Sequence, residues 1–111
     1  MQHKTDRYIQ LSGLLTKSLP AIKCQFQKYG INHGTSKRQV LLVNLQITPE
    51  VTIDHLWVTS PSLVSAKLRT NQPITVSGKL AKRTRPGVTY KDEPTLDVQL
   101  TKVILCENQK Q

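Results

Sequence analysis

Residues able to do acid–base or nucleophilic chemistry are few in this sequence of 111 residues, and their spacing does not favour catalysis. Asp54 and His55 are the most suggestive pair, but they are neighbours in a strand-like segment, and strand neighbours are expected to point to opposite faces of a sheet. Asp92 and Glu93 stand beside Pro94 in a turn-forming stretch, with no partner for proton transfer. The sequence contains no GxSxG, Walker A, HExxH or GxGxxG motif. We therefore expect a protein that is not an enzyme.

Metal and thiol chemistry is equally sparse. The two cysteines, Cys24 and Cys106, lie far apart and belong to no CxxC pair, and no pair of histidines stands near either. We expect two reduced thiols packed as small apolar side chains, no metal site and no other cofactor. The polar N-terminus and the absence of an apolar run of about 18 residues predict a cytoplasmic protein with no membrane contact.

Positive charge dominates the chain and is organised along it. Sixteen Lys and Arg residues stand against seven Asp and Glu, for a formal net charge of +9. Residues 7–49 contain six basic residues and no acidic one, and residues 55–91 contain seven basic residues and again no acidic one. An anionic partner is expected. Single-stranded nucleic acid fits best, because it binds to cations along its phosphates and to flat side chains under its bases.

The expected binding site consists of eleven cationic and aromatic residues: Lys28, Tyr29, Lys37, Arg38, Trp57, Lys79, Lys82, Arg83, Arg85, Tyr90 and Lys91. The Lys and Arg side chains would contact phosphates, and Arg adds a planar surface that Lys lacks. Tyr29, Tyr90 and Trp57 would stack on bases. Only 5% of the residues are aromatic, so most of the binding free energy is expected from phosphate contacts, which weaken as salt rises.

Five short strands and one helix are expected to position these residues. Alternation and turn residues place the strands at residues 7–15 (bending at Gly13 and continuing at 21–26), 39–47, 51–59, 74–80 and 95–106. Two polar stretches, 27–38 and 81–94, are expected to be long loops after the first and fourth strands. Ser60 followed by Pro61 predicts the N-terminus of a two-turn helix that stops before Pro73.

The second strand carries the clearest prediction of faces. Its inward face is expected to consist of every second residue, namely Leu41, Val43, Leu45 and Ile47. Val40 and Leu42 are then expected on the outer face beside Asn44, where they would offer a contact to a partner. The third strand does not alternate cleanly, so its inward side is left open.

The order of elements predicts an all-β OB-fold, a five-stranded barrel with one short helix between strands 3 and 4. The whole chain is expected to form one such domain, with frayed polar ends at about 1–6 and 107–111. In this fold the loops after strands 1 and 4 border a ligand groove on strands 2 and 3. The two basic loops would therefore flank the groove.

Several segments resemble the bacterial single-stranded DNA-binding protein family and its short relative, the primosomal replication protein N. The likeness is carried by the following stretches: Leu11-Ser12-Gly13, 55–58 with the helix 61–69, 73–80 with its V-x-G-x-L pattern, and 97–105. The resemblance implies a homo-oligomer that binds single strands in replication, recombination or repair. The chain has fewer aromatic residues than that family and ends without its acidic tail, so recruitment of proteins through the tail is not expected.

Two other functions remain open. The barrel could be a protein-interaction adaptor in a nucleoprotein or defence complex, with the basic loops meeting an acidic protein. Alternatively, it could bind structured RNA or a ribosome, because basic OB domains also dock on phosphate-dense RNA. Competition experiments distinguish these alternatives from single-strand binding.

Overall fold

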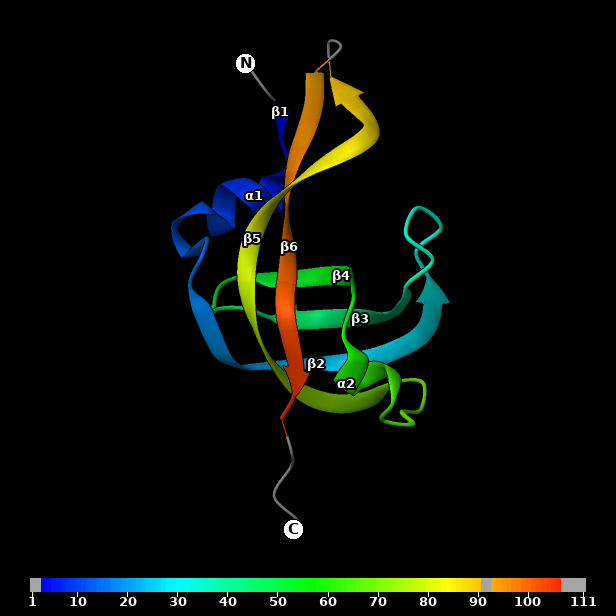
Figure 1. Cartoon of the computed structure of the whole chain (residues 1–111). Helices are drawn as coiled ribbons and strands as arrows, with labels where there is room; N and C mark the ends of the chain where they lie inside the picture. The colour runs from blue at the N-terminus through cyan, green and yellow to red at the C-terminus, as the bar shows by residue number, and fades with distance from the viewer. Residues whose placement is uncertain (1–2, 91–92, 107–111) are drawn as a thin grey trace.

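Five long strands form one strongly curled sheet (Figure 1). The computed structural model describes residues 3–90 and 93–106, and for residues 3, 85–90, 93 and 94 it describes the backbone alone. The strands are β2 (Ser18–Ile31), β3 (Arg38–Gln46), β4 (Thr52–Val58), β5 (Gln72–Tyr90) and β6 (Glu93–Leu105). The remaining elements are β1 (His3–Lys4), α1 (Asp6–Leu11), the 3₁₀ turn η1 (Ser12–Leu14) and α2 (Pro61–Val64).

The strand order is that of an OB-fold. The sheet runs β1-β6-β5-β2-β3-β4, and every neighbouring pair is antiparallel except β1 with β6. The two ends of the curl approach each other, since β4 contacts β6. The short helix α2 lies between β4 and β5, as expected. The prediction of an all-β, five-stranded OB-like fold is thus confirmed, with β2 to β6 as the five strands of a curled half-barrel sheet.

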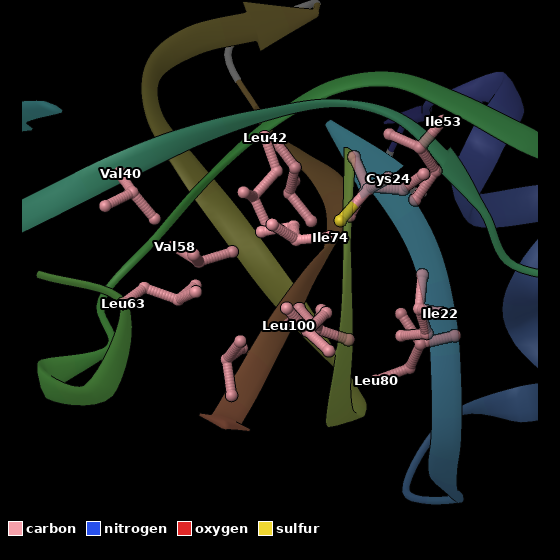
Figure 2. Close-up of a cluster of buried hydrophobic side chains, with 14 of the residues drawn as sticks. Ile22, Cys24, Val40, Leu42, Ile53, Val58, Leu63, Ile74, Leu80 and Leu100 are labelled. Atoms are coloured by element: carbon pink, nitrogen blue, oxygen red, sulfur yellow. The ribbon is translucent and has the colours of Figure 1, made fainter. Parts of the chain in front are cut away.

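The core fills the inside of the curl. Figure 2 shows side chains from every long strand converging there, among them Ile22, Leu42, Ile53, Leu80 and Leu100, all buried. Cys24 belongs to this core, and its burial raises the pKa of the thiol to about 12. Both cysteines are free thiols, as predicted, and Cys106 is partly exposed.

The N-terminal segment is helical, so the prediction of a strand at 7–15 was wrong. Thr5 caps α1 with its hydroxyl, which accepts the Tyr8 N–H at 3.1 Å. Tyr8 and Leu11 are three residues apart and turn the same face of α1 to the barrel, where Leu11 is fully buried. Gly13 lies in η1 and bends no strand. His3 and Lys4, expected in a frayed end, pair with Thr95 and Leu96.

Strand β2 is longer than predicted and shortens the first loop. It continues through Ile31, so residues 27–31 of the expected loop belong to the sheet and the turn to β3 spans only 32–37. The Asn32 side chain makes this turn compact, because its Oδ1 accepts the N–H groups of Gly34 at 2.8 Å and Thr35 at 3.2 Å. Lys28 and Tyr29 are therefore held on a strand.

The predicted faces of the second barrel strand were reversed at its start. In β3 the residues Val40, Leu42 and Leu45 are buried, while Leu41 and Val43 are half-buried on the outer face. Asn44 explains the change of phase, because its φ of 55° is left-handed and interrupts the alternation between Leu42 and Leu45. Val40 and Leu42 are consequently not available to a partner.

In β4 the alternation of buried and exposed residues is also interrupted, at the residues that pair with the interruption in β3. Its buried residues are Ile53, Leu56 and Val58, and each lies opposite a buried residue of β3. This settles the inward face that the sequence had left open. Trp57 stands between two buried neighbours and therefore points outward.

The expected loop at 81–94 is mainly a β-hairpin. Strand β5 continues to Tyr90 and pairs with β6 up to the Tyr90–Glu93 position. Threonine, valine and tyrosine in this stretch favour extended backbone. This extended backbone pairs with the antiparallel strand β6. Figure 1 shows the far end of this hairpin beyond the other long strands.

The helix after β4 is shorter than predicted. The predicted N-cap is confirmed, since the Ser60 hydroxyl accepts the Leu63 N–H at 3.3 Å and donates to the Val103 carbonyl at 2.7 Å. The α-helix itself ends at Val64, and residues 65–71 form a loop that leads to β5.

Among the described residues, no helix has both the length and the apolar content that a membrane crossing requires.

Candidate nucleic-acid interface

Two adjoining hollows form one groove on the outside of the barrel, which we call the Trp57 groove. One hollow has a volume of about 440 Å³ and is lined by Lys28, Tyr29, Gly30, Ile31, Asn32, His33, Gln39, Trp57 and Arg83. The other has a volume of about 380 Å³ and is lined by Asn32, Gln39, Trp57, Thr59, Arg83, Gln99, Leu100, Thr101 and Lys102. Trp57 belongs to both, so the two hollows meet at its indole.

The indole of Trp57 is an exposed platform held in place by a glycine. Its relative exposure is 36%, which is large for the single tryptophan of a small domain. The six-membered ring abuts the backbone of Gly30, where an added Cβ would lie 2.7 Å from both Cη2 and Cζ3. The Lys28 ammonium lies over the ring, 6.0 Å from its centroid, at the limit of a cation–π contact. Only glycine at position 30 permits this approach.

The charge of the groove is positive. Lys28, Arg83 and Lys102 line it, and none of its lining residues is acidic. Asp97 lies opposite Arg83 in the β5–β6 ladder, but its carboxylate is bound by Arg7, with Nη2–Oδ2 at 2.6 Å and Nε–Oδ1 at 2.7 Å. Within residues 4–84 and 95–106, Arg83 forms no ion pair. Its guanidinium therefore contributes positive charge to the groove lining.

Polar side chains complete the groove, and sequence reasoning missed them. Gln39 donates to Thr59 Oγ1 at 3.2 Å, Gln99 donates to the Lys82 carbonyl at 3.4 Å, and Thr101 donates to the Lys79 carbonyl at 3.2 Å. Apolar and polar residues alternate from Leu96 to Thr101, and this alternation was a usable signal that Gln99 and Thr101 face away from the core. Such amides and hydroxyls can bind base edges or phosphates.

Lys102 was missed for a different reason. Its φ is 54°. It lies on β6 at the point where the register with β5 shifts, between the Lys79–Thr101 and Ser77–Ile104 pairs. A bulge of this kind redirects a side chain, and here it brings Lys102 to the groove. No residue type in the sequence marks the position of the bulge.

The structure brings together four of the eleven predicted site residues: Lys28, Tyr29, Trp57 and Arg83. Arg38 and Lys79 line two neighbouring hollows instead. Lys37 is exposed in the 32–37 turn and Lys82 is exposed on β5, and neither lines the Trp57 groove. The side chains of Arg85 and Tyr90, and the whole of Lys91, lie outside the described residues.

The Asp54–His55 pair does not follow the strand alternation assumed from the sequence. Both residues are exposed and line one hollow of about 420 Å³ between α1 and β4. The His55 carbonyl accepts a hydrogen bond from Arg7 Nη1 at 3.0 Å, so its main chain anchors α1.

Within the part of the chain that the structure describes, no cluster of three His, Cys, Asp or Glu residues could hold a metal ion.

Comparisons with family models, with curated proteins and with solved structures found no match to this chain. The likeness of its segments to single-stranded DNA-binding proteins stays a prediction. The feature that bears most directly on function is the Trp57 groove, whose residues come from strands that the fold brings together.

Proposed function

We propose that this protein binds single-stranded nucleic acid in the Trp57 groove. The observation that carries the proposal is one exposed indole bordered by Lys28, Arg83 and Lys102, with no acidic residue in the groove lining. Single strands bind to proteins through this combination of a stacking surface and a cationic track. The position on the outer face of β3 and β4 is the usual ligand face of an OB-fold.

The groove suits a single strand better than a duplex. In a duplex the base faces are stacked on one another, so the exposed indole of Trp57 would find no free base face to contact. A single strand presents unstacked bases, and one base stacked on an aromatic side chain contributes about 1–3 kcal/mol. With three cations in the groove, log K is expected to change by about −2 per tenfold increase in salt.

DNA is proposed ahead of RNA, and a role in replication, recombination or repair is proposed with it. Both rest on the resemblance of segments 55–58, 73–80 and 97–105 to bacterial single-stranded DNA-binding proteins. Assembly into a homo-oligomer is part of the same proposal. Sedimentation velocity tests it, and a monomer at micromolar concentration would contradict it.

The test is fluorescence anisotropy of a labelled dT oligonucleotide at two salt concentrations. Lys28→Ala and Arg83→Ala are each expected to weaken binding about 3–10-fold and to reduce the salt slope by about 0.7. Lys23→Ala is the matched control, since Lys23 is exposed on the same strand as Lys28 but does not line the groove. Equal losses for all three variants, or no binding at low salt, would refute the proposal.

Competitors in the same assay separate the rival functions. If an acidic protein displaces the labelled oligonucleotide as effectively as unlabelled dT, the adaptor function is favoured. Preferential displacement by folded RNA would favour a structured-RNA partner. Our proposal predicts that unlabelled single strands compete best.

A further inference from the structure

A second hollow lies next to the Trp57 groove, and we call it the α2 hollow. It has a volume of about 600 Å³ and is lined by Tyr29, Gly30, Ile31, Arg38, Val64 and Lys67. Tyr29, Gly30 and Ile31 also line the Trp57 groove. The end of β2 is therefore a shared wall, and the two depressions adjoin along it.

The floor of the α2 hollow is apolar and pre-ordered. The Tyr29 ring packs against Phe26, with centroids 4.6 Å apart and planes tilted by 54°. Its hydroxyl accepts the Leu68 N–H at 2.9 Å, which ties the ring to the loop after α2. Ile31 is 58% exposed and Tyr29 is 42% exposed, so the apolar side chains that line this hollow are open to a ligand.

The rim of the hollow is cationic. Arg38 stands at the start of β3 and Lys67 in the loop after α2, both are exposed, and no lining residue is acidic. The arrangement repeats that of the Trp57 groove, in which an aromatic floor is bordered by Lys28 and Arg83. A nucleotide presents a flat apolar face beside a phosphate, and both depressions fit that pattern.

We infer that the α2 hollow is a second nucleotide-binding subsite, reached by the same single strand that occupies the Trp57 groove. The strand would cross the end of β2, because Tyr29, Gly30 and Ile31 line both depressions and the Trp57 ring abuts Gly30. Bases would stack at Trp57 and at Tyr29, and Arg38 and Lys67 would contact the phosphates beyond Gly30. This inference rests on the proposed function and extends the binding surface to a face that α2 helps to form.

The experiment compares a short and a long dT oligonucleotide, of about 6 and about 16 nucleotides, spanning the site sizes known for OB-folds. Lys67→Ala and Arg38→Ala are each expected to weaken binding of the long oligonucleotide about 3–10-fold, because both side chains line the α2 hollow and not the Trp57 groove. Binding of the short oligonucleotide should change less than twofold, because it fits within the Trp57 groove. Lys67→Ala should also lower the salt slope by about 0.7 for the long oligonucleotide alone.

Two further variants control for folding. Ser65→Ala removes an exposed hydroxyl after α2 that donates to the Pro61 carbonyl at 3.1 Å and lines neither depression, so it should retain long-oligonucleotide binding despite a small loss of stability. Lys23→Ala removes an exposed cation outside both depressions and should affect neither oligonucleotide. Unfolding curves for each variant separate loss of binding from loss of fold.

The outcomes distinguish this inference from the proposed function. No binding of either oligonucleotide to the wild-type chain would refute the proposed function itself. The second subsite alone would be overturned if the wild type bound both oligonucleotides while Lys67→Ala and Arg38→Ala weakened the two equally, or weakened neither. A third outcome would also overturn the second subsite. If an acidic peptide bound the wild type but not Lys67→Ala, and if Lys67→Ala bound long dT as the wild type does, the hollow would be the site of a protein partner.

Discussion

At the scale of residues, binding in the Trp57 groove depends on how the indole is held. Gly30 leaves the indole room to lie against β2, since a Cβ there would be 2.7 Å from two ring carbons. We expect Gly30→Ala to push the indole outward, because the side chain can move more easily than the strand. Tryptophan emission should then shift to longer wavelength, and dT affinity should fall about 3–10-fold, which the titration measures.

Gly13→Ala provides the matched control for this prediction. A Cβ at Gly13 would meet nothing within 4 Å, so the substitution should leave emission and affinity unchanged. If Gly30→Ala bound dT as tightly as the wild type with unchanged emission, Gly30 would not position the indole.

The buried Asp97 carboxylate links stability to pH. Burial raises its pKa, but hydrogen bonds from Arg7, from the Val98 N–H at 2.7 Å and from Thr5 at 2.9 Å, with the Arg7 charge, together hold the pKa below its ordinary value of 3.8. As the pH falls, the unfolded chain binds a proton before the folded chain does. This stabilisation is therefore full above about pH 5 and is lost as the pH falls through the folded pKa.

Removal of Arg7 tests this linkage. Arg7→Ala removes the guanidinium that binds the buried Asp97 carboxylate and should lower the free energy of unfolding at pH 7 by about 3 kcal/mol. The value is at the low end for buried pairs because 26% of the Arg7 side chain is exposed. Urea unfolding at pH 7 and pH 3.5 measures it, and the variant should lose less stability on acidification than the wild type. Arg69→Ala, an exposed arginine, should behave as wild type in both respects.

At the scale of elements, Asn44 determines which side chains of β3 reach the core. Its φ of 55° suits Asn or Gly but strains a β-branched residue. Asn44→Gly should change stability by less than about 1 kcal/mol, whereas Asn44→Val should lower it by about 1–2 kcal/mol. Gln46→Val, at an exposed position of the same strand, controls for β-propensity and should not destabilise. Equal stability of the two Asn44 variants in urea unfolding would show that the left-handed backbone carries no constraint.

The same element shows where sequence reasoning stops. Strict alternation predicts the inward side of a strand only while the backbone stays extended. In β3 one left-handed residue interrupts the alternation, so Val40 and Leu42 are buried where the sequence had predicted Leu41 and Val43. The N-cap at Ser60 and the strand at 95–106 were predictable because their signals are local. The strand character of 81–90 was hidden because it depends on pairing with β6. The outward position of Trp57 also required the phase of β4, which is set by pairing with β3.

At the scale of the whole molecule, charge is segregated among the hollows. Asp6, Asp54 and Asp97 line the hollow between α1 and β4, where Arg7 binds Asp97. The Trp57 groove and the α2 hollow are lined by cations without any acidic residue. Five of the sixteen Lys and Arg residues thus line these two depressions, and their combined field is expected to raise the association rate for anions and to make it salt-dependent.

The most direct test of nucleic-acid binding in the Trp57 groove uses Trp57 itself, because it is the only tryptophan in the chain. Its fluorescence is followed while the protein is titrated with dT oligonucleotide, and separately with heparin, a polyanion without bases. We expect saturable quenching with dT that weakens as salt rises, and little change with heparin, since only a base can stack on the indole. Quenching that is equal for the two ligands, or dT binding that leaves the emission unchanged, would contradict binding at this groove.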